Sequence, residues 1–173
     1  DKALKALDDT TFFPSKGKER LKAMIETRPD WCVSRQRVWG VPLPIFVNKK
    51  TKEILVDDKV NENIASIYEK EGSDCWFSDS PQRFLGEKYK SEDYEKLSDI
   101  VEVWFDSGST HSFVLEKRED LKWPASMYLE GSDQHRGWFH SSLLESCGTR
   151  GKAPFESILS HGFVVDGKGL KMS

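Results

Sequence analysis

The sequence predicts an α/β fold built around a parallel sheet. Near its end the chain has an apolar stretch at 126–129, a helical pattern at 134–149 and another apolar stretch at 158–165. A strand, a helix and a second strand in this order form a βαβ unit, whose two strands run parallel. The polar turn 130–134 follows the first strand, and open parallel sheets bind ligands at the carboxyl ends of their strands. We therefore expect the functional site at this turn.

Composition supports one folded unit with a small appendage. The chain has 173 residues, a net charge of -3, six Trp and ten Phe, which is enough apolar surface for a core. No apolar run approaches the roughly 18 residues of a membrane span, and the first residues do not resemble a signal peptide. Three scattered cysteines without a Cys-x-x-Cys pair predict reduced thiols, a cytoplasmic location and no zinc site.

The earlier part of the chain predicts short elements. Apolar residues at helical spacing predict a helix at 15–27, which ends before a proline. The segment 41–47 is rich in strand-forming residues but contains two prolines, so we expect an edge strand in a hairpin with 53–56. A surface helix is expected at 61–70, and 78–99 is expected to be a largely polar, exposed loop.

The later part of the chain begins with a further expected strand. The segment 100–105 is predicted to be a short buried strand that leads into polar and glycine residues. The segment 164–171 is predicted to be a glycine loop with a basic end. Residues 162–168 resemble a phosphate-binding loop, but Gly169 replaces the hydroxyl residue that would hold magnesium. Strand-like residues at 163–165 also argue against that loop, because they cannot point successive amides at phosphate.

Titratable residues leave several kinds of site open. His111, His135, His140 and His161 lack the spacing of a helical zinc site, so hydrogen-bonding roles are favoured and no metal ligand is expected. The carboxylates Asp106, Glu130 and Asp133 would allow a glycosidase-like pair, but spacing along the chain does not give their separation.

Four segments carry a family resemblance. They are WCVSRQRVWG at 31–40, VWFDSGS at 103–109, MYLEGSDQHRGWF at 127–139 and KMS at 171–173. In this order they resemble the isoleucyl-tRNA synthetases, which are class I enzymes. The first is shared with valyl and leucyl relatives, whereas 130–138 resembles the isoleucyl branch in particular. The resemblance implies the second half of a Rossmann-like nucleotide-binding fold with a small hairpin and helix insertion.

The resemblance also implies a domain division and a reaction. Residues 1–99 would return from the editing insertion, and 100–173 would be the second half of the catalytic domain. This family activates isoleucine with ATP and Mg²⁺ and transfers it to tRNA(Ile). By resemblance, six residues bind the aminoacyl-adenylate: Glu130, Gly131, Asp133, Gln134, Trp104 and Trp138. Four line the adenine: His161, Gly162, Phe163 and Val164. Lys171 and Ser173 begin the loop that offsets phosphate charge, and no residue is assigned to a metal.

The residue types suit these implied roles. A carboxylate can pair with an ammonium group or accept hydrogen bonds from both ribose hydroxyls. Two indoles can form a slot for an aliphatic side chain. Such a slot discriminates poorly against an amino acid whose side chain is one methylene smaller, as is known for this enzyme family. A lysine can stabilise developing phosphate charge.

The sequence also departs from the family pattern. It ends before the second lysine of the Lys-Met-Ser loop and contains no His-Ile-Gly-His-like motif, so we expect an excised fragment that is inactive alone. The expected partners of the longer protein are isoleucine, ATP and tRNA(Ile), with no membrane, and we expect a monomer. Three alternatives remain: a valyl-type synthetase, a non-catalytic RNA-binding accessory paralogue, and an unrelated hydrolase that uses Asp106 or Glu130.

Overall fold

The computed structural model describes residues 2–172 and divides the chain into two compact units. The first, which we call the sheet unit, combines the residues up to Trp31 with those from Val103 onward. The second, the inserted unit, comprises Cys32–Glu102. The sequence-based division between residues 99 and 100 grouped the first thirty residues differently. As a statement about the domains of a longer protein, it stays a prediction.

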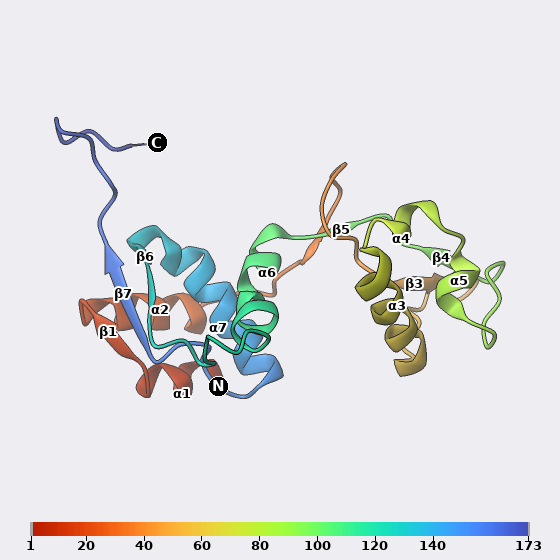
Figure 1. Ribbon diagram of the computed structural model, residues 1–173, viewed down its shortest axis with the longest axis horizontal. Helices are drawn as coiled ribbons and strands as arrows, with labels where there is room; N and C mark the ends of the chain where they lie inside the picture. The colour runs from red at the N-terminus through yellow and green to blue at the C-terminus, as the bar shows by residue number, and fades with distance from the viewer. Residues whose placement is uncertain (1, 173) are drawn as a thin grey trace. The chain divides into compact units, whose positions relative to one another are not determined.

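The sheet unit contains three parallel strands in the order β1-β7-β6. β1 (Thr11–Phe13) and β6 (Tyr128–Gly131) flank β7 (Ser157–His161), as Figure 1 shows. α7 (Trp138–Thr149) connects β6 to β7, after a 3₁₀ turn, η2 (Ser132–Arg136). The βαβ unit and the parallel sheet predicted from the sequence are therefore confirmed.

Helices supply the apolar side chains that cover this sheet. α1 (Lys2–Asp8) and α2 (Lys16–Glu26) pack with α7, and the α2 bounds agree with the predicted helix. Five side chains of this core are fully buried: Leu7, Leu21, Phe139, Leu143 and Ile158. Phe139 and Leu143 are four residues apart and share one face of α7. Each such side chain contributes about 1.5–3 kcal/mol through burial. Within residues 2–172, no helix combines the length and apolarity needed to cross a membrane.

The predicted strand at 100–105 was largely wrong. Only β5 (Ile100–Val101) is a strand, and it pairs antiparallel with β2 (Ser34–Arg35) in the inserted unit. The chain turns into α6 (Val103–Gly108) instead, followed by the π-helix η1 (His111–Leu115). Val, Trp and Phe favour strands, but these side chains are exposed in α6 rather than buried in a sheet. The expected strand at 158–165 also ends early, at His161.

Besides β2 and β5, the inserted unit contains a second antiparallel pair and three helices. β3 (Phe46–Asn48) pairs with β4 (Tyr94–Lys96), and the helices are α3 (Asp58–Glu71), α4 (Cys75–Ser78) and α5 (Pro81–Leu85). The expected helix at 61–70 is confirmed as part of α3. The Asp57 carboxylate caps this helix by accepting hydrogen bonds from the first-turn amides of Lys59 and Val60.

Two expectations for the inserted unit need correction. The hairpin between 41–47 and 53–56 is reduced to one bridge, Val47 to Ile54, because β3 pairs mainly with β4. The range 78–99, expected to be a loop, contains α5 and β4. The polar residues of β4 concealed its role, since its pairing partner lies far away in the sequence.

Trp76 is the centre of the inserted unit. Its side chain is fully buried and lies 5.1 Å from Phe46 and 4.9 Å from Phe84, measured between ring centroids. The indole Nε1–H donates a 2.7 Å hydrogen bond to the Leu97 carbonyl, which ties the segment after β4 to α4. Burial and hydrogen bonding thus combine at one residue.

We expect Trp76→Ala to lower the free energy of unfolding by about 3–5 kcal/mol, because it leaves a large cavity in this core. The control is Trp39→Ala, since Trp39 is 88% exposed and should change stability by about 0.5 kcal/mol or less. Urea unfolding of the 173-residue chain measures both. Equal costs for the two variants would contradict the assigned core.

A buried histidine links two helices of the sheet unit. The Arg28 guanidinium, just after α2, donates a 3.0 Å hydrogen bond to Nε2 of His140 in α7. Burial first, and the Arg28 charge second, lower the pKa of His140 from its ordinary 6.5 to about 4. His140 therefore stays neutral in the fold, and its Nε2 accepts the hydrogen bond that the Arg28 guanidinium donates.

This shift predicts acid sensitivity. Between about pH 6.5 and about pH 4 the unfolded chain binds a proton at His140 and the folded chain does not, so stability falls as pH falls through this window. We expect His140→Met to flatten the dependence of the unfolding free energy on pH within it. Urea unfolding across the window measures the slope, and an unchanged slope would exclude His140 as a source.

Candidate functional site

A pocket of about 330 Å³ opens at the carboxyl ends of β6 and β7. The parallel register places Gly131 opposite His161, so the segments that leave the two strands face the same space. Nine residues line the pocket: Glu130, Gly131, Asp133, His161, Gly162, Phe163, Val164, Lys171 and Met172. Eight of these were singled out from the sequence, and Met172 was missed although it lies between two assigned residues of the Lys-Met-Ser segment.

Two carboxylates stand at the end of β6. Oε2 of Glu130 accepts a 2.8 Å hydrogen bond from the Gly131 amide, which fixes the carboxylate beside the strand end. A methyl group on Gly131 would lie 2.5 Å from Oδ1 of Asp133, so the missing side chain leaves room for the second carboxylate. Both side chains are exposed. They can therefore bind an ammonium group or hydroxyl groups of a ligand.

The end of β7 supplies an imidazole and an extended backbone. Nδ1 of His161 is hydrogen-bonded to the Gly162 carbonyl, so Nδ1 carries the proton and Nε2 is an acceptor in the neutral ring. Residues 162–164 are exposed, and Phe163 presents 54% of its surface. Backbone polar groups and an aromatic face are thus accessible at this side of the pocket.

A small hairpin returns Lys171 to the pocket. Oδ1 of Asp166 accepts hydrogen bonds from the amides of Lys168 (2.8 Å) and Leu170 (2.9 Å), and Gly169 supplies the positive φ of 79° that closes the turn. The Met172 amide then bonds the Val164 carbonyl at 2.9 Å. This places Nζ of Lys171 4.0 Å from the centroid of the Phe163 ring. An ammonium group therefore shares the pocket with the two carboxylates. Ser173 lies outside the described residues.

The remaining predicted residues gather at the start of α7. The Trp138 indole stacks on Tyr128, with centroids 3.9 Å apart and planes 5° apart, and its Nε1–H bonds the Ser107 carbonyl at 3.0 Å. Oε1 of Gln134 accepts a 2.9 Å hydrogen bond from the Trp138 amide. Trp104 of α6 lies against Gly137, since a methyl group there would be 2.9 Å from its ring. We call Trp104 and Trp138 the aromatic pair; neither they nor Gln134 lines the pocket.

Two further buried histidines, His111 and His135, make hydrogen bonds to the backbone. Nδ1 of His111 bonds the Gly108 carbonyl at 3.0 Å, and Nδ1 of His135 bonds the Ser132 carbonyl at 2.7 Å. Among residues 2–172 there is no group of three or more His, Cys, Asp or Glu that could hold a metal ion. These histidines therefore have the hydrogen-bonding role that the spacing favoured.

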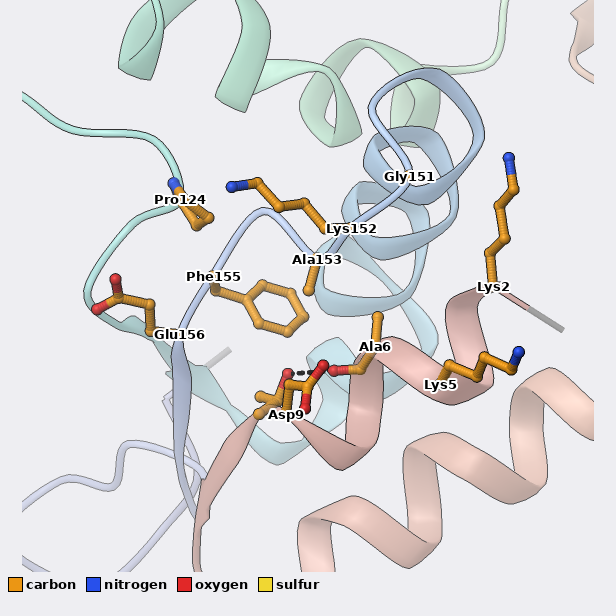
Figure 2. Close-up of a pocket in the computed structure, with 11 residues that line it drawn as sticks. Lys2, Lys5, Ala6, Asp9, Pro124, Gly151, Lys152, Ala153, Phe155 and Glu156 are labelled. Atoms are coloured by element: carbon orange, nitrogen blue, oxygen red, sulfur yellow. Dashed lines mark hydrogen bonds between the residues drawn. The ribbon is translucent and has the colours of Figure 1, made fainter.

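A second pocket, of about 300 Å³, lies at the amino ends of the strands (Figure 2). Phe155 and Ala153 form its apolar floor, and lysines surround it. Figure 2 shows that Lys152 points toward Pro124, whereas Lys2 and Lys5 lie on the other side of Phe155. The three ammonium groups do not converge on one ligand position. The pocket at the carboxyl ends is the stronger candidate, in agreement with the general rule for parallel sheets.

Arg35 and Arg37 of the inserted unit differ in their surroundings. Nη1 of Arg35 donates to the carbonyls of Cys32 (2.6 Å) and Ser34 (2.8 Å), so this side chain supports its own loop. Arg37 is exposed beside Val38 and Trp39. Arg37 therefore presents its charge to solvent, whereas the Arg35 guanidinium is engaged by the backbone of its own loop.

The fold and the pocket define an α/β domain with a parallel sheet and a polar site at the carboxyl ends of its strands. All 173 residues match the family described as tRNA synthetases class I (I, L, M and V). The chain belongs to this family.

Two proteins named isoleucine–tRNA ligase are highly similar to this chain. The chain is 91% identical to an isoleucine–tRNA ligase of Pelagibacter ubique over 172 residues, which are 99% of this chain and 19% of that protein. It is 58% identical over 171 residues to the isoleucine–tRNA ligase of Zymomonas mobilis, covering 99% of this chain and 18% of that one. The chain thus spans about a fifth of the curated relatives that it matches.

A solved structure shares the fold. A LeuRS–tRNA–LeuAMS ternary complex from Agrobacterium radiobacter K84 aligns with a TM-score of 0.54 and 22% identity, over 84% of this chain and 20% of that chain. The predicted fold class, a class I synthetase domain with a parallel sheet and helices, is confirmed by the family match and this likeness.

Gly137 provides a test of the packing at the aromatic pair. We expect Gly137→Ala to destabilise the chain by about 1–3 kcal/mol, because the new methyl group would lie 2.5 Å from Oε1 of Gln134 and 2.9 Å from Trp104. The control is Gly148→Ala, also in α7, where nothing lies within 4 Å and a gain of about 0.5–1 kcal/mol is expected. Urea unfolding measures both. Similar effects of the two variants would contradict the described contacts.

Proposed function

We propose that this chain is the part of an isoleucine–tRNA ligase that binds isoleucyl-adenylate at the pocket between the ends of β6 and β7. The observation that carries the proposal is the convergence of Glu130, Asp133, His161 and Lys171 on one pocket. The 91% identity to a named isoleucine–tRNA ligase supports the amino acid assigned. The longer protein would join isoleucine to ATP, release pyrophosphate and then transfer the isoleucyl group to tRNA(Ile).

Each side chain has a role that its chemistry allows. Glu130 would pair with the ammonium group of isoleucine, and Asp133 would accept hydrogen bonds from ribose hydroxyls. The backbone at 162–164 would face the adenine, beside Phe163. Lys171 would offset the charge that develops on the phosphates as pyrophosphate leaves. The aromatic pair and Gln134, which gather at the start of α7, would contact the isoleucine part of the adenylate.

Mg²⁺ would enter with the nucleotide. Magnesium in nucleotide enzymes usually keeps several of its waters and is bound largely through the substrate phosphates, so no side chain of this pocket is assigned to it. The ion would neutralise phosphate charge there. ATP and Mg²⁺ are thus the proposed substrate and cofactor, acting in a monomeric enzyme of the cytoplasm.

Two alternatives have less support. A valyl-type synthetase fits the family, but the first relatives reported above are isoleucine–tRNA ligases. A non-catalytic RNA-binding paralogue would require no adenylate pocket. The 173-residue chain alone should be inactive, because the groups that complete such a site must be positioned together with those present.

The test replaces Glu130 or Lys171 by Ala in the full-length protein that carries this segment. We expect each change to lower kcat/KM of isoleucine-dependent ATP–pyrophosphate exchange by about 10–150-fold, the effect of losing one hydrogen bond to a charged group. Glu130→Ala should act mainly through the KM for isoleucine, and Lys171→Ala mainly through kcat.

The control is Glu119→Ala, an exposed glutamate outside the pocket that should leave exchange unchanged. Exchange that responds to valine and not to isoleucine would favour the valyl alternative. tRNA binding without any exchange would favour the accessory paralogue.

A further inference from the structure

Glu145 is a buried carboxyl group for which the proposed reaction has no use. It lies in the middle of α7, and both its oxygens are buried and without a hydrogen-bond partner among the described residues. Buried carboxyl groups are normally paired, because leaving one unpaired is costly. An unpaired buried carboxyl group therefore needs a physical explanation.

The carboxyl group faces the last residue of α6. A methyl group added to Gly108 would lie 2.8 Å from Cδ of Glu145 and 2.9 Å from Oγ of Ser141. Gly108 is itself buried. α6 thus packs on α7 with its backbone directly against the Glu145 carboxyl, and no side chain separates them.

Two titratable groups act with Glu145 from the neighbouring elements. Burial raises the pKa of Glu145 to about 8, and the negative charge of Asp106 in α6 adds to the rise. On the other side, the charge of Glu145 contributes, after burial, to a raised pKa of Tyr128 in β6. Burial and the Asp106 charge therefore disfavour the carboxylate, whereas Tyr128 is uncharged at neutral pH, and the protonated form of Glu145 persists there.

The same contact carries the aromatic pair. α6 holds Trp104, which lies against Gly137, and the Ser107 carbonyl, which accepts the Trp138 hydrogen bond. An ionised Glu145 would need water at its oxygens, and Gly108 of α6 lies directly against them, so hydrating the carboxylate on that side would require α6 to move away from α7. Such a movement would separate Trp104 from Gly137 and break the bond to Trp138.

We propose that Glu145 is a positioning residue: its uncharged carboxyl lets α6 pack directly on α7, and this packing fixes the aromatic pair. The consequence for isoleucine binding rests on the proposed function. When Glu145 loses its proton at alkaline pH, the packing of α6 on α7 weakens. The affinity for isoleucine therefore falls as the pH rises. The proton on Glu145 is thus part of what shapes the amino-acid site.

The first measurement is hydrogen exchange by mass spectrometry on the full-length protein. Peptides that cover residues 103–115 are compared between the wild type and Glu145→Gln, an uncharged side chain of the same shape. We expect equal exchange at about pH 6.5 and at least threefold faster exchange in the wild type at about pH 9. This readout does not require activity.

The second measurement is the KM for isoleucine in ATP–pyrophosphate exchange. Between about pH 7 and about pH 9 the KM of the wild type should rise about tenfold more than that of Glu145→Gln, with a smaller effect on kcat. The ratio of the two proteins removes the titration of isoleucine itself. Glu119→Gln, an exposed control, should follow the wild type.

Several results would overturn the proposal. Glu145→Gln could follow the wild type in both profiles, or could exchange faster already at about pH 6.5, which would indicate a merely structural residue. If that variant does not fold, Glu145→Met provides a second uncharged side chain for the same comparison. A wild type without isoleucine-dependent exchange at any pH would remove the proposed function alone, and the hydrogen-exchange comparison would still decide the role of Glu145.

Discussion

The parallel register between β6 and β7 is the constraint on which the site depends. It sets Gly131 opposite His161. The nine pocket residues lie at the ends of these two strands, in the segments that directly follow them, or in the hairpin that returns to them. The two strands stay in this register because α7 connects them and buries Phe139 and Leu143 over the sheet. A shift of one residue would turn the side chains of the shifted strand, such as Glu130 in β6, to the other face of the sheet. The packing of α7 on one face of the sheet thus determines where the pocket side chains lie at the carboxyl ends of the strands.

Local patterns explain which parts of the fold could be predicted. The βαβ unit rests on apolar runs and on one helix face, and both are visible over a few turns of chain. The pocket could be located because the turn 130–134 directly follows a predicted strand and because the family resemblance pointed to residues 161–164. β4 could not be found in this way, because its three residues are partly polar and its partner, Phe46–Asn48, is remote in the sequence. α6 was misjudged because its residues favour strands but lie exposed on a helix.

The functional residues also differ in whether they could be predicted from the sequence. The family resemblance of the four motifs was sufficient to single out eight of the nine pocket residues. It was not sufficient for Glu145, which the sequence presents as an ordinary charged residue on a helix. Only the approach of Gly108 reveals that this carboxyl is enclosed. Environments made by contacts between distant residues are therefore what a single sequence conceals, even where it displays the chemistry.

The stem of the inserted unit has a consequence for engineering. β2 and β5 pair antiparallel, and the Glu102 amide bonds the Val33 carbonyl at 2.8 Å, so the chain leaves and returns along adjacent strands. Because the two ends of this segment are adjacent, a short turn that joins β2 directly to β5 could replace all the residues between them. The path of the rest of the chain would stay the same. The inserted unit keeps its own core around Trp76. Architecturally, this part of the protein is modular, and its two pieces could be redesigned one at a time.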